Sequence, residues 1–466
     1  MNTCLVIKNF YQQYKIEIFI FILALFLRLV FFYFAAAKEV FIYENLRADG
    51  YYEIAYNLVN HGIFSISRME LDSHRTPGLP FLIVPFLYAG SVLSFFILQI
   101  IVGSLLPVLG RRLAVLLCLP SKIATVIAVF LAVDPMGIKL SLVMLTETFF
   151  TLFFLLSVFF SVHFIRLSSV MQMNRHKIIK TVIYSGVFLG IATLFRPTTL
   201  YLPALLIGFW ILWRYLAKQK LLWPCLIIFL IVAWLLPAGW TYRNYRVFNV
   251  AAYSSIKEGV LYAALAPSIL AFKNNIDYTT AQNRFFASEG LLGMPDVNID
   301  RAADFQKRAT VVILANSKQF LEVAAVSVFT FFTHDGALDL LSLAGFNTGV
   351  SASFPHGLSV FKQSAGQFFS MLIRILKTPL FIILFMRLVW FAVAIIFVFS
   401  LGYQVINKKI NAPCLFLLIC ILYFALTTIT NGLTVNARFR FPVNTLILIF
   451  AAQGVYSFWI QKRRVA

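Results

Sequence analysis

Charged residues are scarce in this chain of 466 residues, at 12%, whereas 61% of its residues are hydrophobic and its mean hydropathy is +0.87. Charged residues normally make up about a quarter of a soluble globular chain. The composition therefore excludes a soluble domain and predicts an all-α, polytopic membrane protein.

Several familiar signals are also missing. The five cysteines show neither a disulfide framework nor metal-ligand spacing, and the six histidines are dispersed. The sequence contains no Walker A loop, H-E-x-x-H or G-x-S-x-G motif, which excludes the usual nucleotide-binding and hydrolase readings. The predicted outer loops lack an N-x-[ST] acceptor. That absence favours a bacterial plasma (inner) membrane over a eukaryotic secretory one.

Long apolar runs recur along the chain. About 20 apolar residues cross a hydrocarbon core of roughly 30 Å, and we predict about 10 to 12 transmembrane helices. The first run, 18–37, is too long for a cleaved signal peptide. The other predicted spans are 92–109, 123–133, 148–164, 181–195, 199–213, 221–239, 381–401, 415–429 and 441–459. Two further stretches, 311–332 and 367–385, are apolar enough to enter the membrane or to lie on it.

Lysine and arginine are distributed unevenly between the predicted loops. With the N-terminus inside, the inner segments hold many basic residues, including Lys122, Arg166 and Arg214, but one acid, Glu17. The positive-inside rule then predicts that both termini are cytoplasmic and that the other acids face or border the outer surface. This topology explains the net charge of +21. The basic residues beside the spans also attract anionic lipid head groups. Nucleic acid is not a predicted partner, because the positive charge is scattered.

We treat 1–466 as one membrane domain with two long outer, periplasmic loops, 38–91 and 240–379. In the first loop, helical spacing after Asp49 predicts an amphipathic helix that ends near Gly62. Three prolines then interrupt the apolar stretch 74–90, which predicts a bent interfacial helix. The second loop carries further interfacial helices, in 256–271 and 301–332. Loops of this length that carry most of the polar residues usually have a function.

Acidic residues at the outer boundary are the first candidates for chemistry. Asp49 either caps the helix that follows or acts in catalysis. Glu147 and Asp134 lie at the outer membrane edge, where a carboxylate needs a partner or water. For Asp134, which precedes Pro135, a structural turn is the stronger interpretation. Arg28 lies inside the first span and either reaches the surface or neutralises Glu147 or a bound phosphate.

Arginines at the outer ends of spans run against the positive-inside bias. They indicate either an anionic partner at the outer face or contact with lipid head groups. These residues are Arg75, Arg196, Arg243, Arg246, Arg438 and Arg440.

The stretch "RADGYYEIAYNLVNHGIFSISRMELDSHRTPGLPFLIVPFLYAG" resembles the first outer loop of C-type (GT-C) membrane glycosyltransferases related to family 39. That group includes protein O-mannosyltransferases, lipid A aminoarabinose transferases and bacterial galacturonosyltransferase-like proteins. The resemblance continues in "DPMGIKLSLVMLTETFF", "GIATLFRPTTLYLP", "WTYRNYRVF" and "NARFRFPVNTLILIFAAQG". These landmarks, in this order, cover most of the chain.

The resemblance implies a GT-C fold and sugar transfer from a polyprenyl-phosphate donor at the outer membrane face. It implies that Asp49 is the general base of one inverting displacement. The candidates for a second carboxylate are Glu147, Glu53 and Asp134, and of these we predict Glu147 as a catalytic residue. The substrate-binding residues that we predict are Tyr52, His74, Arg75, Arg196, Arg243, Arg246 and Arg438. Many relatives have a second acid directly after the first, where this chain has Gly50. A divalent metal held by an acidic pair is therefore not supported, and no cofactor is predicted.

Two other functions fit part of the pattern. A flippase or transporter of lipid-linked oligosaccharides predicts internal repeats and broken helices near the midplane. An O-antigen polymerase or ligase shares the polyprenyl donor and an arginine-rich outer loop but does not need an acid after the first span. The sequence leaves open the sugar and the acceptor, which is an envelope glycan, a lipid or a protein.

Overall fold

The computed structural model describes residues 3–36, 46–168, 175–293, 295, 297–346, 364–376 and 381–465. Helices are the only extended regular elements within these ranges, and one isolated parallel β-bridge joins Arg47 to Met144. The prediction of an all-α fold is confirmed. Residues 37–45, which belong to the end of the first predicted span and to the first predicted loop, lie outside the described residues. So do residues 377–380, which belong to the optional stretch 367–385.

Nine helices of the described residues are long and apolar enough to cross a membrane, or up to eleven if each of two bent pairs is one span. This number agrees with the predicted 10 to 12 at its lower end. Eight of the nine are α1 (Thr3–Ala36), α4 (Val92–Leu116), α7 (Glu147–Ser168), α8 (Arg175–Phe195), α9 (Leu202–Leu216), α10 (Trp223–Phe248), α19 (Phe381–Ile406) and α20 (Ala412–Thr428). The ninth joins α21 (Ala437–Arg440) and η5 (Phe441–Val443) to α22 (Asn444–Val465).

The two bent pairs explain the ambiguous predicted spans. The short run predicted at 123–133 is α5 (Ser121–Val133), which continues past Pro135 as α6 (Pro135–Leu142) with a bend of 52°. The optional span at 311–332 is divided between α14 (Ala302–Ala315) and α15 (Ser317–Thr333), which meet at 100°. Of the second optional stretch, 367–376 lies in α18 (Ala365–Leu376) and 381–385 begins α19.

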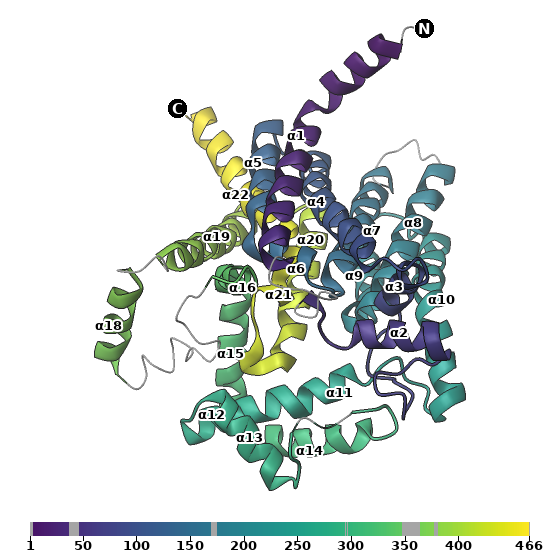
Figure 1. The fold of residues 1–466 in the computed structure, drawn as a ribbon. Helices are drawn as coiled ribbons and strands as arrows, with labels where there is room; N and C mark the ends of the chain where they lie inside the picture. The colour runs from purple at the N-terminus through teal and green to yellow at the C-terminus, as the bar shows by residue number, and fades with distance from the viewer. Residues whose placement is uncertain are drawn as a thin grey trace.

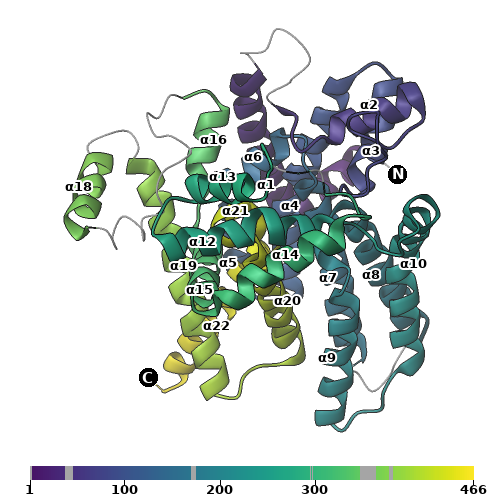
Figure 2. The same ribbon diagram turned by 90° about the horizontal axis from the view of Figure 1, so that it is seen from below.

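The long helices form a bundle whose two ends differ (Figure 1). The start of α1 and the end of α22 lie at the same end of the bundle, at the top of the view. The opposite end carries a layer of shorter helices from the second long loop, which cross the bundle when seen from below (Figure 2). These are α11 (Ile256–Val260), the π-helical turn Leu261–Leu265, α12 (Ala266–Asn274), α13 (Tyr278–Ser288) and α14.

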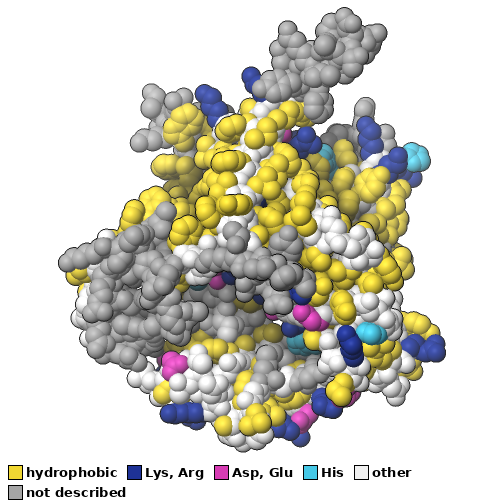
Figure 3. Space-filling view, in the orientation of Figure 1, with side chains coloured by type: hydrophobic (Ala, Val, Ile, Leu, Met, Phe, Trp, Pro, Cys, Tyr) yellow, Lys and Arg dark blue, Asp and Glu magenta, His cyan; other side chains and the backbone are white. Residues whose placement is uncertain are grey.

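Surface chemistry follows this division. The bundle surface is largely hydrophobic, whereas polar and charged side chains are common in the lower part of the view, over the layer of α11 to α14 (Figure 3). Helix α10 runs to Phe248, beyond the predicted end of its span at residue 239. The "WTYRNYRVF" segment is therefore helical, and the second outer loop starts after it.

The first outer loop has the predicted amphipathic helix. α2 (Tyr51–His61) lies across the end of the bundle (Figure 1) and ends at Gly62, whose φ of 69° is typical of a helix C-cap. The proline-containing stretch forms α3 (Gly78–Tyr88), which packs against α2. These two helices place the residues between them, 62–77, at the end of the bundle opposite the start of α1 (Figure 1).

Two polar residues that we considered for chemistry have structural contacts instead. The prediction that Arg28 reaches the surface, Glu147 or a phosphate is wrong, because its side chain is buried and donates to Ser141 Oγ at 3.0 Å and to carbonyl oxygens. Asp134 caps α6, since its Oδ2 accepts the N–H of Gly137 at 3.0 Å. The turn interpretation of Asp134 is therefore the correct one.

Candidate active site

Asp49 lies in a tight turn that is strained for most residues. Its φ is 60°, and Gly50 follows with φ 76°, so two consecutive residues have left-handed backbone conformations. Aspartate tolerates this region better than most non-glycine residues, and glycine has no steric cost there. A Cβ atom on Gly50 would lie 2.8 Å from Cδ1 of Ile66. The turn therefore disfavours the second acid that many relatives have at this place.

The helix-cap interpretation of Asp49 does not hold. Gly50 is the residue before α2, and no side chain caps the start of that helix. The Asp49 carboxylate instead contacts an arginine from the other end of the chain, with Oδ2 2.9 Å from Nη2 of Arg438. One of the two roles that the sequence left open for Asp49 is thus removed.

A β-bridge brings the segment of Asp49 beside the segment of Glu147. Arg47 pairs with Met144, and the N–H of Met144 donates to the carbonyl of Leu46 at 2.7 Å. Asp49 follows this bridge by two residues, and Glu147 follows it by three. The short pairing therefore fixes the start of both segments relative to each other.

Glu147, the first residue of α7, is the centre of an ion network. Its Oε1 contacts Nε of Arg438 and lies 2.8 Å from Nη1 of Arg196. Its side chain is 0% exposed, so the charge is stable only because two guanidinium groups compensate it. Its place in the first turn of α7 also favours a negative charge. Since Arg438 contacts Asp49 as well, one guanidinium bridges the two acids.

The two carboxylates differ in access. The side chain of Asp49 is 33% exposed, whereas that of Glu147 is fully buried. A substrate can therefore reach Asp49 but not Glu147. Burial by itself would raise the pKa of Asp49, but Arg438 and then Arg75 outweigh that effect and hold the pKa below its usual value. Asp49 is ionised at neutral pH and can accept a proton.

The position of Arg438 depends on the short segment before the last span. Asn436 Oδ1 accepts the backbone N–H of Arg438 at 2.9 Å and caps α21. Two residues later, Arg440 is buried and donates to the carbonyls of Phe332 and His334, at the end of α15. Arg440 thus satisfies carbonyl groups at the end of α15. Arg438 instead pairs with Asp49 and Glu147.

Arg75 is the second arginine near Asp49. Its backbone N–H donates to Oδ1 of Asp72 at 2.7 Å, and its guanidinium lies 5.7 Å from the centre of the Tyr51 ring. Its Nε is buried and has no hydrogen-bond partner among the residues that the structure describes. In contrast to Arg438 and Arg196, Arg75 therefore has a donor available for a ligand.

His74 joins the two outer loops. Its Nδ1 lies 3.2 Å from Oγ of Ser255, and its carbonyl accepts the hydroxyl of Ser254 at 2.6 Å. Burial, with a smaller effect of Arg75, lowers the pKa of His74 to about 4. At neutral pH the imidazole is therefore uncharged. His74 contacts the second loop as a neutral residue, and the arginines carry the positive charge near Asp49.

Three predicted binding residues are not brought to the ion network. Arg243 donates to the carbonyl of Asp72 at 3.0 Å and lies 4.8 Å from the Trp240 ring. Arg246 is exposed and donates to the hydroxyl of Tyr242 at 3.1 Å. The third, Tyr52, has its ring against the guanidinium of Arg47, 3.4 Å away. None of these contacts between described residues involves Asp49 or Glu147.

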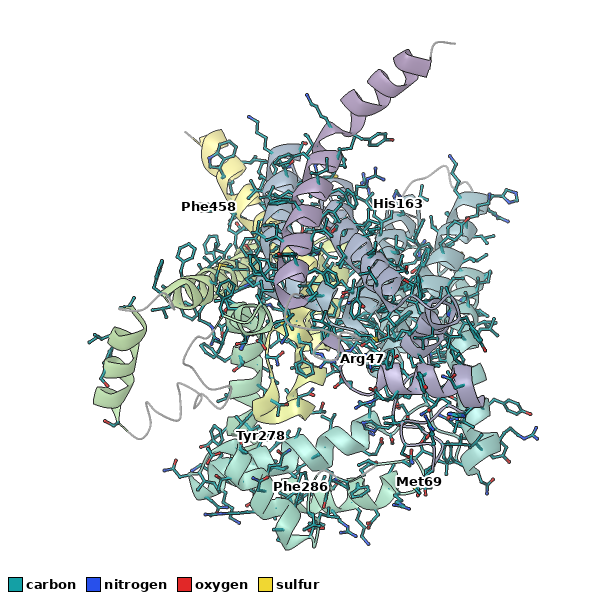
Figure 4. All side chains as sticks on the ribbon, in the orientation of Figure 1. Arg47, Met69, His163, Tyr278, Phe286 and Phe458 are labelled. Atoms are coloured by element: carbon teal, nitrogen blue, oxygen red, sulfur yellow. The ribbon has the colours of Figure 1, made fainter. Side chains whose placement is uncertain are left out.

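Arg47 is a residue that the sequence reasoning did not single out. Figure 4 shows it where the bundle meets the start of α2. Its position two residues before the candidate base was the available signal. Among the described residues there is also no group of three or more His, Cys, Asp or Glu side chains that could hold a metal ion.

An open groove of about 500 Å³ lies along α10 and the two residues that precede α9. Its lining includes Leu200, Tyr201, Trp234 and Tyr242, and it is mainly apolar. The first lining residue, Leu200, follows Arg196 by four residues, with the turn η2 (Pro197–Thr199) between them. Its volume lies within the range of ordinary ligand sites.

Residues 85–250 match the model of the dolichyl-phosphate-mannose-protein mannosyltransferase family. The match includes Glu147 and Arg196 but not Asp49, Arg75 or Arg438. The predicted resemblance to family 39 is confirmed for this part of the chain, and the match agrees with the predicted class of enzyme, a membrane glycosyltransferase that uses a polyprenyl-phosphate sugar. No curated protein matches the chain significantly.

Solved structures of an archaeal enzyme have a similar fold. The oligosaccharyltransferase of Archaeoglobus fulgidus in its apo form has a TM-score of 0.53 and 10% identity, and the alignment covers 97% of this chain and 51% of that one. The same coverage and TM-score hold for AglB from Archaeoglobus fulgidus in complex with an inhibitory peptide and a dolichol-phosphate, at 12% identity. The chain thus spans about half the length of these proteins. The predicted GT-C-like fold is confirmed.

Proposed function

We propose that this chain transfers a sugar from a polyprenyl-phosphate donor to a hydroxyl group of an acceptor, with Asp49 as the general base. The match of residues 85–250 to a family of dolichyl-phosphate-mannose enzymes supports the donor class. The observation that carries the proposal is the accessible, ionised carboxylate of Asp49, held by an arginine that a fully buried glutamate also holds.

The chemistry is a single displacement. Asp49 takes the proton of the acceptor hydroxyl, and the acceptor oxygen forms a bond to the anomeric carbon of the donor. The bond between that carbon and the phosphate oxygen breaks, and its electron pair leaves with the polyprenyl phosphate. Because attack and departure occur on opposite faces of the sugar, the anomeric configuration inverts. Glu147 acts by positioning Arg438 and Arg196.

Arg75 is the residue that we assign to the donor phosphate. Arg438 and Arg196 already carry the carboxylates of Asp49 and Glu147, whereas Nε of Arg75 is unpaired within the described residues. A guanidinium donates well to phosphate oxygens, and a charge-assisted hydrogen bond is about twice as strong as a neutral one. Arg75 also lies near enough to Asp49 to lower its pKa.

The apolar groove on α9 and α10 is the proposed place of the isoprenoid chain. Both helices are membrane-span candidates, so the groove opens toward lipid. A lipid carrier gains free energy by burying its chain, at about 25 cal/mol per Å² of apolar surface. The turn at Pro197–Thr199 separates the first lining residue, Leu200, from Arg196 in the sequence, and we place the phosphate of a bound carrier on the side of Arg196.

The proposed setting is the inner membrane of a bacterium, with both termini cytoplasmic and the site at the periplasmic face. The start of α1 and the end of α22 lie at one end of the bundle, and the site and the layer of α11 to α14 lie toward the other (Figure 1). The acceptor is an envelope glycan, a lipid or a protein that carries a free hydroxyl group.

The function is tested with purified protein in nanodiscs and a series of radiolabelled undecaprenyl-phosphate sugars. We expect sugar-dependent release of undecaprenyl phosphate when an envelope extract supplies the acceptor. A parallel assay in proteoliposomes measures translocation of the same lipids. Translocation without any transfer would contradict the glycosyltransferase proposal and favour the flippase.

A further inference from the structure

We propose that Arg47 is the anchor of an oxyanion-binding subsite beside Asp49, which takes a phosphate or carboxylate group of a substrate. This inference rests on the proposed function for its substrate class. It adds a binding residue that neither the resemblance nor the family match assigns.

The first observation is the state of the guanidinium. Its Nε and Nη2 atoms are both buried, and neither has a hydrogen-bond partner among the described residues. A buried polar donor without a partner is costly, and a charged one more so. Such a group is uncommon in folded proteins unless a ligand or water satisfies it.

The second observation is which donors are unpaired. Nε and Nη2 are adjacent donors on one edge of the guanidinium plane, and this edge forms two parallel hydrogen bonds with a carboxylate or a phosphate. A guanidinium that only packed against its neighbours would not keep two adjacent, buried donors without hydrogen-bond acceptors. The unpaired edge therefore matches the geometry of an oxyanion.

The third observation is how Arg47 is held. The backbone of Arg47 forms the β-bridge with Met144, and the guanidinium lies 3.4 Å from the centre of the Tyr52 ring. Tyr52 stacks in turn on Tyr56, with 6.2 Å between the ring centres. The face of the guanidinium is thus occupied and its orientation fixed, so the ordering cost on binding is small.

The fourth observation is the location. Arg47 is two residues before the candidate base, at the junction of the bundle with α2 (Figure 4). The arginines that act on the Asp49 carboxylate, together with Arg47, its neighbour in the sequence, form two classes. Arg438 and Arg196 are committed to carboxylates, whereas Arg47 and Arg75 keep unpaired donors. An anionic ligand would supply the hydrogen-bond acceptors that the unpaired donors of Arg47 and Arg75 lack.

Two sources can supply the oxyanion: the phosphate of the polyprenyl donor, shared with Arg75, or a separate anionic group of donor sugar or acceptor. The test measures binding of undecaprenyl phosphate and of undecaprenol, which has the same chain without the phosphate, to the full protein in nanodiscs. Inorganic phosphate is the third probe, with the shift in unfolding temperature as its readout. The variants are Arg47→Gln and Arg47→Lys.

If the donor phosphate is the ligand, Arg47→Gln weakens binding of undecaprenyl phosphate by about 10- to 100-fold and leaves undecaprenol unchanged. Arg47→Lys weakens it less, because lysine keeps the charge but not the two-donor edge. If the oxyanion belongs to another group, undecaprenyl phosphate binds as before, but the stabilisation by inorganic phosphate is lost in Arg47→Gln. Either result supports the subsite and identifies its source.

The matched control is Arg112→Gln. Arg112 also lies over a tyrosine ring, that of Tyr14, at 5.5 Å, but at the other end of the bundle. It should bind all three probes as the wild type does. Unchanged binding of undecaprenyl phosphate and of inorganic phosphate in Arg47→Gln would overturn the subsite. A wild type that does not prefer undecaprenyl phosphate to undecaprenol would contradict the proposed function instead, and the inorganic-phosphate arm would still decide on Arg47.

Discussion

Arg438 joins two acids that are far apart in the sequence, with Nη2 2.9 Å from Oδ2 of Asp49 and Nε in contact with Oε1 of Glu147. The fully buried Glu147 fixes the guanidinium, and the guanidinium fixes the accessible Asp49. A base that is held in place before the substrate arrives loses less entropy in the reaction. Glu147 therefore positions Asp49 through the arginine that both acids contact.

Glu147→Gln should lower both stability and turnover. The substitution leaves the guanidinium groups of Arg438 and Arg196 without their common carboxylate, and breaking a buried ion pair costs about 3–5 kcal/mol. We expect a clear drop in unfolding temperature in nanodiscs and at least about a tenfold loss of transfer. Asp304→Asn removes an exposed partner of Arg308 and should change neither. Normal turnover in Glu147→Gln would show that Arg438 does not need the buried acid.

Arg75→Gln should affect donor affinity and the pH profile together. Loss of a charge-assisted contact to phosphate should raise the KM for the donor by about 10- to 100-fold. Because Arg75 helps to lower the pKa of Asp49, its removal should also move the acid limb of the pH–kcat/KM profile to higher pH. The same depressed pKa means that Asp49 stabilises the fold above its ordinary carboxyl pKa, and that this contribution is lost as the pH falls through the lower folded value. A raised KM with an unmoved limb would place Arg75 away from Asp49.

His74→Asn should reduce the sensitivity of the fold to mild acid. Burial lowers the pKa of His74 to about 4 in the folded protein, so the unfolded chain binds the proton more readily. Stability from this group is therefore complete above pH of about 6.5 and is lost progressively toward pH 4. We expect the wild-type unfolding temperature to fall over this window and the fall to be smaller in His74→Asn. The exposed His61 provides the control, and His61→Asn should behave as the wild type.

Ala238→Trp should block the apolar groove. Ala238 lines the groove on α10, and an indole there would occupy part of its volume of about 500 Å³. The KM for an undecaprenyl donor should rise by about tenfold or more, whereas a donor with two isoprene units should be used as before. Leu235→Trp places the same ring on an exposed part of α10 outside the groove and is the matched control. Equal KM values for the long donor in both variants would move the chain to another surface.

The sequence was informative where a local pattern determines the structure. Helical spacing and Gly62 predicted α2 and its end, and apolar length predicted most of the spans. The outer boundary positions of Asp49, Glu147 and Arg438 made them candidates, but their contacts join segments far apart in the chain, and only the fold shows them.

The remaining differences between the sequence predictions and the structure also arise from contacts between segments that are far apart in the chain. The sequence placed Arg28 inside the first span and Arg440 at the outer end of the last one but did not show their partners, and both are buried because backbone carbonyls of distant helices accept their N–H groups. Arg243 lies against the rings of Trp240 and Phe248, which are near it in the chain, and donates to the carbonyl of Asp72 in the first loop. Arg47 depends on a bridge to Met144, which no local pattern predicts.

The most direct test of the central claim is the single-turnover rate of Asp49→Asn, measured with donor binding in the same nanodiscs. The matched control is Asp339→Asn, because Asp339 has a similar exposure, 31%, and a similar ion pair, 2.8 Å from Nζ of Lys139. We predict that Asp49→Asn binds the donor normally but transfers sugar about 10²- to 10⁴-fold more slowly, while Asp339→Asn is unaffected. A transfer rate in Asp49→Asn equal to that of the wild type would contradict the assignment of Asp49 as the base.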